Sequence, residues 1–135
     1  MKKIIGFQWA SKVAAAIFIL LIVFHAVVIA GIVFFDFAPV EYLWGGRMEK
    51  AGQLLQFEII SLLTTSLALW LVLAKSGKSN AGRLLPVVSF LMWLLVVLFA
   101  LNTLGNLTAQ SFFEQLMSIP TALLTVLCLR IALGK

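Results

Sequence analysis

Four long apolar segments, joined by short polar connections, make up most of the chain. They cover residues 13–35, 54–74, 84–101 and 116–133. Each is close to the roughly 20 residues that a helix needs to cross a hydrocarbon core of about 30 Å. Continuous apolar runs of this length are not typical of barrel strands, which are short and alternate in polarity. The pattern predicts an all-α, polytopic membrane protein with four transmembrane helices.

The composition supports the same fold class. Hydrophobic residues make up 63% of the chain and charged residues 11%, whereas soluble domains have about 45–50% and about 25%. We expect one transmembrane domain over 1–135, without a soluble domain. The first apolar run exceeds the core of a signal peptide, which is about 7–15 residues long, and is expected to be a retained helix. The expected helices cover about 12–35, 52–75, 83–106 and 111–133.

Charge is distributed unevenly between the ends of these helices. One side carries eight basic and no acidic residues: Lys2, Lys3, Lys12, Lys75, Lys78, Arg83, Arg130 and Lys135. All five acidic residues belong to the other side. Basic residues favour the cytoplasmic side of a membrane, so an up-down-up-down bundle with both termini cytoplasmic is predicted, in the plasma membrane (the inner membrane of a bacterium). Attraction of basic residues to anionic lipid explains the net charge of +5 without a nucleic-acid partner.

Polar side chains gather in the half of the bundle that is predicted to be outer. His25 lies about 18 Å along the first helix, just past the midplane, and Glu58 falls within the second helix. An ionisable residue at such depth is costly and indicates a functional site. We expect His25 and Glu58 to face each other in an outward-facing pocket. Ser61 and Asn102, at similar depth, are the expected further partners.

The connection between the first two helices contains a candidate cover for this pocket. Residues 34–50 read FFDFAPVEYLWGGRMEK. Its aromatic residues are typical of anchors at a membrane interface, and Gly45 and Gly46 permit a tight reversal. Arg47 is expected to lie above the pocket. The alternative is an exposed ion pair with an acidic neighbour in the same connection, worth about 0–1 kcal/mol.

Each polar residue also has a structural interpretation. His25 could simply bond a neighbouring carbonyl or hydroxyl group inside the bundle, and Glu58 could reach the outer head groups. Ser111 and Glu114 have the spacing of a capping box, in which the Glu side chain returns to the N–H of the capping residue. Pro120 is expected inside the fourth helix.

Two further residues have structural interpretations, and two alanines suggest close packing. Arg130 is near enough to a helix end to extend towards the head groups. Cys128, the single cysteine, is expected to be a packing residue. Ala26 and Ala30 are spaced to let two helix backbones approach.

Three stretches together resemble small four-helix integral membrane proteins of bacteria: FFDFAPVEYLWGGRMEK, FEIISL and LNTLGNLT. The resemblance implies the fold and no site residues. Small multidrug transporters are similar in size and helix number, but their essential carboxylate lies in the first helix. Here the first helix carries His25, and the carboxylate is Glu58 of the second helix.

Three functions remain open at this point. The first is a module that binds or transports a small amphipathic or cationic ligand through His25, Glu58, Ser61, Asn102 and Arg47. The second is a structural or regulatory partner in a homo-oligomer or a larger membrane complex, and the third is a membrane enzyme acting on a lipid-like substrate. No nucleophile–base motif or H-E-x-x-H set is present, so we expect no catalytic residues, metal or cofactor. The ligand is not identified by the sequence.

Overall fold

The computed structural model describes residues 4–134, and all regular structure in that range is helical. The long helices are α1 (Phe7–Phe35), α2 (Ala51–Lys75), α3 (Leu85–Leu107) and α4 (Phe112–Ala132), and the short 3₁₀ helices are η1 (Trp44–Gly46) and η2 (Gly82–Leu84). All four long helices are long and apolar enough to cross a membrane. The prediction of an all-α chain with four such helices is confirmed. Helix α1 begins at Phe7, earlier than the expected start near residue 12.

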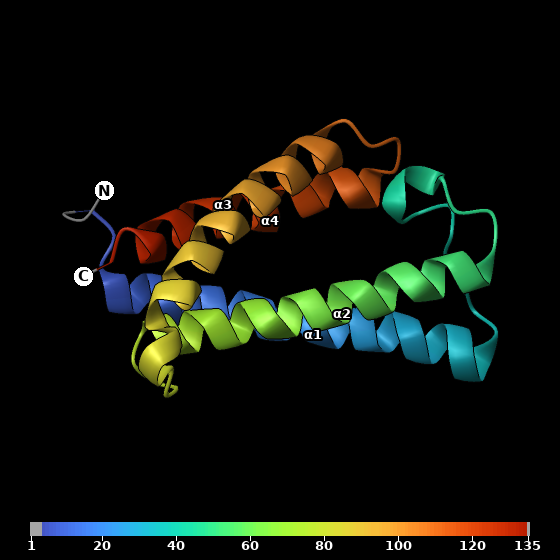
Figure 1. Cartoon of the computed structure of the whole chain (residues 1–135). Coiled ribbons are helices and arrows are strands. Elements are labelled where there is room, and N and C mark those ends of the chain that lie inside the picture. The colour runs from blue at the N-terminus through green and yellow to red at the C-terminus, as the bar shows by residue number, and fades with distance from the viewer. Residues whose placement is uncertain (1–3, 135) are drawn as a thin grey trace.

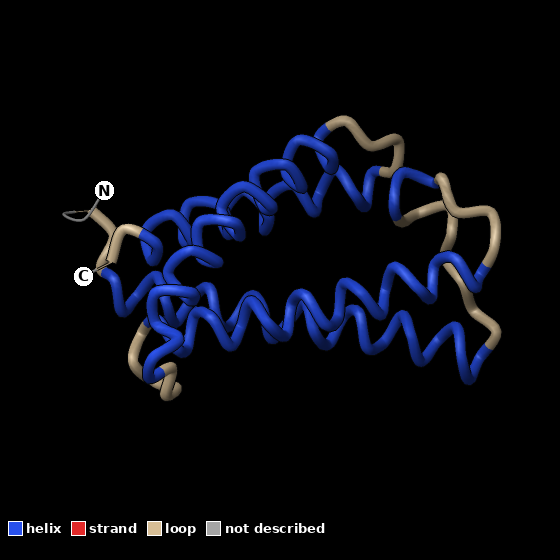
Figure 2. The backbone as a smooth tube through the Cα atoms, viewed as in Figure 1, coloured by secondary structure: helices blue, strands red, loops and turns tan. Residues whose placement is uncertain are grey.

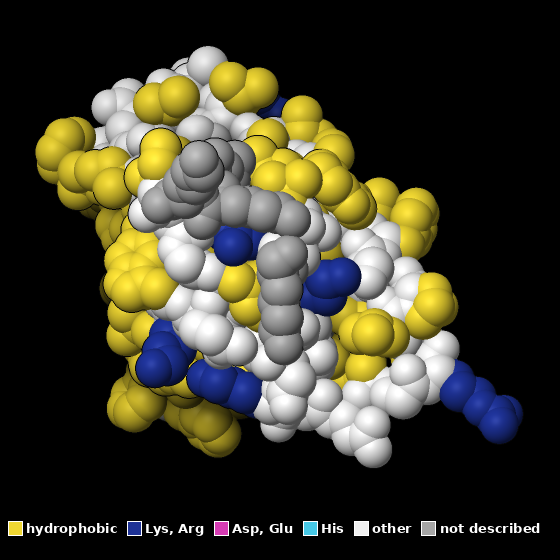
Figure 3. Space-filling view, turned by 90° about the vertical axis from the view of Figure 1, so that its left-hand side faces the viewer, with side chains coloured by type: hydrophobic (Ala, Val, Ile, Leu, Met, Phe, Trp, Pro, Cys, Tyr) yellow, Lys and Arg dark blue, Asp and Glu magenta, His cyan; other side chains and the backbone are white. Residues whose placement is uncertain are grey.

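The connections between the helices lie at two opposite ends of the molecule (Figures 1 and 2). The α2–α3 connection lies at the same end as the chain termini, and we call this the basic end. Figure 3 looks onto it and shows Lys and Arg side chains gathered there. The α1–α2 and α3–α4 connections lie at the other end, which we call the acidic end. Which end faces the cytoplasm stays a prediction.

The helices pack as two pairs, α1 with α2 and α3 with α4. At the basic end the pairs meet, and α1 also packs against α4 and α2 against α3. Towards the acidic end α3 and α4 diverge from α1 and α2 (Figure 1). The divergence leaves the two pairs least closely packed where the polar side chains of the sequence gather.

The main apolar core fills the basic half of the bundle. Phe18, Leu71, Met92 and Leu124 are buried there, one from each helix. Phe18 also packs against Phe99, with ring centroids 5.5 Å apart. Burial of side chains from all four helices at one level closes the bundle in this half.

Close backbone approach occurs at other alanines than the expected pair. Ala26 is exposed and Ala30 is half-buried, whereas Ala10 and Ala14 are completely buried. The expectation for Ala26 was wrong because the helix pairs are in closest contact at the basic end, half a helix away from that residue.

Arg130 also differs from the expectation. Its side chain does not extend towards the head groups but turns inward and is only 4% exposed. Nε donates to the carbonyl oxygen of Ile5 and Nη1 to that of Gly134, both at 2.6 Å, and the guanidinium lies 5.7 Å from the centre of the Phe7 ring. Arg130 turns inward because two backbone carbonyl groups near the chain ends accept its hydrogen bonds.

Candidate functional site

A cavity of about 580 Å³ lies at the acidic end of the bundle. Its walls come from all four long helices and from the Leu43–Arg47 segment. The volume falls in the range of about 300–1,000 Å³ that is typical of small-molecule sites. The five predicted site residues all line it: His25, Arg47, Glu58, Ser61 and Asn102.

His25 and Glu58 form a direct contact inside this cavity. The imidazole Nδ1 lies 2.6 Å from Glu58 Oε2, and the side chains are 15% and 1% exposed. The Glu58 side chain is therefore buried inside the bundle and does not reach outward, and His25 bonds to a carboxylate of another helix rather than to a carbonyl or hydroxyl group. The contact forms because each polar group lowers the other's cost of burial.

Trp44 completes the hydrogen bonding of the Glu58 carboxylate. Its indole Nε1–H donates to Glu58 Oε1 at 3.0 Å, and its ring packs on Phe57 with centroids 5.1 Å apart. Both oxygens of Glu58 thus have a partner. Trp44 was expected only at the membrane interface, and neither of the expected partners, Ser61 and Asn102, forms a hydrogen bond with this carboxylate.

The backbone at Trp44 adopts an unusual conformation. Trp44 has φ of 57°, and Gly45 and Gly46 have φ of 69° and 65°. A bulky residue in this left-handed region is an outlier that costs of order 1–3 kcal/mol, whereas glycine adopts it freely. The turn therefore depends on contacts with the rest of the protein, among which is the Trp44–Glu58 hydrogen bond.

Glu114 forms only half of the expected capping box. Ser111 caps α4, and its Oγ accepts the N–H of Glu114 at 3.3 Å. The Glu114 side chain, however, does not return to Ser111. Its Oε1 accepts the backbone N–H of Gly45 at 2.8 Å, because the turn at Gly45 offers a donor nearer the cavity.

The second oxygen of Glu114 is the least satisfied polar atom of this region. Oε2 is buried and has no hydrogen-bond partner within residues 4–134, and the whole residue is only 8% exposed. Glu114 lines the cavity. The cavity wall therefore contains two carboxylates, of which Glu58 is fully bonded and Glu114 is not. The capping-box spacing of Ser111 and Glu114 predicts the cap but not the contact with Gly45.

The other predicted residues have fewer contacts. Arg47 is exposed, lines the cavity and makes no ion pair with Glu41, Glu49 or another acid among residues 4–134. The alternative of an ion pair within its own connection is therefore wrong. Ser61 is half-buried and Asn102 exposed. They present polar groups to the cavity rather than to each other.

A cluster that the sequence did not predict joins α3 to α4 in the same wall. Thr103 Oγ1 donates to Thr121 Oγ1 at 3.1 Å, and Asn106 Nδ2 lies 3.5 Å from the same oxygen. Thr121 follows Pro120, which lies inside α4 as expected. These contacts cross-link the helix pair that forms the far wall of the cavity.

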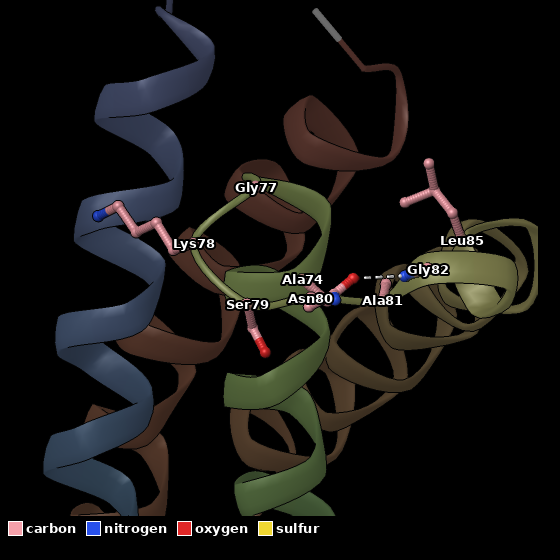
Figure 4. A pocket seen from close by; sticks show the side chains of 8 residues that line it. All are labelled: Ala74, Gly77, Lys78, Ser79, Asn80, Ala81, Gly82 and Leu85. Carbon is pink, nitrogen blue, oxygen red and sulfur yellow. Dashed lines mark hydrogen bonds between the residues drawn. The ribbon is translucent and has the colours of Figure 1, made fainter.

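A second, smaller hollow of about 390 Å³ lies at the basic end (Figure 4). It is formed by the α2–α3 connection, where Asn80 Oδ1 accepts the N–H of Gly82 at 3.0 Å. Figure 4 shows Lys78 extending away from this pair. The residues lining this hollow include no buried polar side chain without a partner, so it offers no comparable site.

No family model, curated protein or solved structure matches the chain. The fold and the cavity define its class, a bundle of four helices able to span a membrane with a polar cavity at one end.

Proposed function

We propose that the chain is a multi-pass membrane protein whose cavity binds a small amphipathic cation. The observation that carries this proposal is the buried, unpartnered Oε2 of Glu114 in the wall of a ligand-sized cavity. A carboxylate oxygen in such a position lacks the donor that would offset its desolvation. A cationic donor group would supply that hydrogen bond and balance the charge.

The apolar part of the wall supports an amphipathic ligand rather than a bare ion. Phe24 and Phe113 are stacked with centroids 5.8 Å apart, and both line the cavity together with Trp44 and Met117. Aromatic faces attract cations and provide apolar area. A cation with an apolar body would use both kinds of surface.

The orientation of the proposed protein follows from its charges. The basic end would face the cytoplasm, in accordance with the preference of Lys and Arg for that side, and the cavity would open to the outside. For a bacterial protein we propose the inner membrane and an up-down-up-down arrangement with both termini cytoplasmic.

The half of the bundle near the basic end is closed, which supports ligand binding rather than transport as the main activity. Phe99 lines the cavity and contacts Phe18 of the main core, and the core beyond it is buried and apolar. A ligand in the cavity would meet this core before reaching the basic end. Transport would therefore require a second conformation in which the core separates.

Calorimetric titration of the purified protein in detergent tests the proposal. The probe is phenylbutylamine, which is cationic at neutral pH, and the neutral reference is phenylbutanol. We expect saturable binding of the amine, at least about tenfold tighter than that of the alcohol, because a charged hydrogen bond contributes about 1.5–3 kcal/mol. Glu114→Gln should remove most of this preference.

The matched control is Glu49→Gln, which neutralises an exposed carboxylate at the same end outside the cavity wall. This variant should bind like the wild type. Equal binding of the amine and the alcohol, or no saturable binding, would contradict the proposal. Loss of an oligomer or complex in Glu114→Gln, without any ligand binding in the wild type, would instead indicate a structural partner.

A further inference from the structure

Glu114 Oε2 imposes a chemical requirement on the ligand. The oxygen is shielded from solvent and has no donor within the described residues, so it needs an N–H or O–H group. A quaternary ammonium ion carries a charge but no such group. Rotation of the Glu114 carboxylate, or a small displacement of the turn at Gly45, would bring Oε2 to the cavity surface.

Arg47 and Glu114, which carry opposite charges, both adjoin Gly45. Its Nε lies 3.6 Å from the position that a Cβ atom on Gly45 would occupy, and the N–H of Gly45 is bonded to Glu114. The two charged groups thus adjoin one residue of the turn without forming an ion pair with each other. A negative and a positive group that are close but unpaired are complementary to a ligand with both charges.

The side of the cavity between α2 and α3 supports entry from the lipid. Several of the lining residues on the two helices are exposed, among them Ile60 and Thr64 on α2 and Leu98 and Asn102 on α3. Helices α2 and α3 diverge towards this end (Figure 1). In a membrane, exposed side chains at this depth meet acyl chains. An amphiphile could place its head group in the cavity while its chains stay in the bilayer.

We infer that the ligand is a membrane amphiphile whose head group carries an N–H ammonium beside an anionic group, as in a phosphoethanolamine lipid. The inference rests on the proposed cation-binding function and specifies its ligand. The ammonium donates to Glu114 Oε2, the phosphate binds the Arg47 guanidinium, and the acyl chains leave between α2 and α3.

Binding of short-chain lipids to the purified protein in detergent tests this inference. The probes are dihexanoyl phosphatidylethanolamine and dihexanoyl phosphatidylcholine, which differ only in the three methyl groups on nitrogen. The wild type should bind the ethanolamine lipid at least about tenfold tighter, because only this lipid donates an N–H bond to the carboxylate. Equal affinities would overturn the inference.

Glu114→Gln removes the acceptor oxygen Oε2 while the rest of the cavity wall stays the same, and so tests the contribution of this oxygen alone. If its carbonyl oxygen keeps the Gly45 N–H, the amide NH₂ takes the place of Oε2 and presents a donor to the ammonium. The preference for the ethanolamine lipid should fall to about onefold. Glu49→Gln, the exposed control, should keep the full preference. A preference that survives Glu114→Gln would overturn the assignment.

Arg47→Gln provides an independent test at an exposed position, where a folding defect is not expected. It should lower the affinity of the protein for both lipids by a similar factor, because both carry the phosphate. It should strengthen the binding of phenylbutylamine, which Arg47 repels. Lipid affinities that do not change would overturn the role of Arg47.

Two controls separate this inference from the function on which it rests. Free phosphoethanolamine carries the same head group without chains and should bind at least about tenfold more weakly than the lipid, because burial of each CH₂ group contributes about 0.8 kcal/mol. Equal binding of the two would overturn entry from the bilayer. If phenylbutylamine binds but neither lipid does, the inference fails and the cation site stands. If no amine binds, both fail.

Discussion

The polar residues of the cavity differ in how completely they are hydrogen bonded. Glu58 bonds to His25 and to Trp44 with its two oxygens, while Glu114 bonds to Gly45 with only one. A carboxylate with both oxygens occupied holds structure together. In the proposed function, the ligand binds to Glu114, the carboxylate that still has a free acceptor.

Replacement of Glu58 should therefore affect stability as well as binding. Glu58→Ala leaves His25 and the Trp44 indole without their acceptor, and we expect the free energy of unfolding to fall by about 1–3 kcal/mol. Unfolding in dodecyl sulfate, followed by circular dichroism, measures it. Glu49→Ala, an exposed control, should change it by less than about 0.5 kcal/mol.

A double-mutant cycle isolates the contact itself. His25→Ala, Glu58→Ala and the double variant should give a coupling free energy of at least about 0.5 kcal/mol. Strict additivity of the two single effects would show that the 2.6 Å contact contributes nothing to folding.

Arg130 is expected to stabilise the basic end by joining the two ends of the chain. Arg130→Met keeps most of the side-chain volume but loses the bonds to Ile5 and Gly134. The free energy of unfolding should fall by about 1–3 kcal/mol. Arg83→Met, which removes an exposed charge at the same end, is the matched control. An equal loss in both variants would refute the structural role.

At the level of single residues, the sequence predicted those contacts that follow from the free-energy cost of burying an ionisable group. His25 and Glu58 are ionisable and lie deep in apolar segments, so an inward contact between them could be expected from the sequence alone. The partners Trp44 and Gly45 could not, because their positions depend on how residues 36–50 fold back over the bundle. Local patterns, such as the spacing of Ser111 and Glu114, predicted the cap of α4 and missed the contact of its side chain.

Among the elements, the turn at η1 (Trp44–Gly46) contributes Trp44 and Gly45 to the wall of the cavity. It is fixed by a bond from Trp44 to Glu58 on α2 and one from Gly45 to Glu114 on α4. It also contains three consecutive residues with positive φ. A conformation with this backbone cost is stabilised by such contacts, and each of the two carboxylates supplies one of them.

Trp44→Phe should loosen this turn while it keeps an aromatic ring against Phe57. Hydrogen–deuterium exchange of a peptide covering residues 41–50 should become at least about threefold faster, because one of the two attachments is lost. Trp93→Phe, an exposed tryptophan of α3, should leave that peptide unchanged. Unchanged exchange in Trp44→Phe would show that the indole bond does not hold the turn.

The helices were the most predictable elements, because continuous apolar runs close to the roughly 20 residues of a membrane span admit few other structures. Their divergence at the acidic end was not predictable. It depends on where large side chains such as Phe18 and Met92 fill the space between helices and where they do not, and the hydrophobic pattern of each helix alone does not contain that information.

For the whole molecule, the orientation in the membrane can be tested by thiol labelling in intact cells. Lys78→Cys and Glu49→Cys, each in a Cys128→Ala background, place one thiol at each end. An impermeant maleimide should label position 49 and not position 78, because the basic end is expected in the cytoplasm. Labelling at 78 alone would reverse the orientation and the side on which the cavity opens.

The wild-type thiol reports on the closed half of the bundle. Cys128 is completely buried in the main core, so a maleimide added to the folded protein in detergent should not react with it, whereas the protein unfolded in dodecyl sulfate should react fully. Rapid reaction in the folded state would indicate that the core opens, as a transporter would require.

The position of the cavity relative to the chain ends has a practical consequence. Helix α1 has 29 residues and is therefore about 44 Å long, and the described chain ends and the cavity lie at opposite ends of it (Figure 1). A fluorescent protein fused to either terminus, or a tag that holds the molecule on a sensor surface, would leave the mouth of the cavity unobstructed.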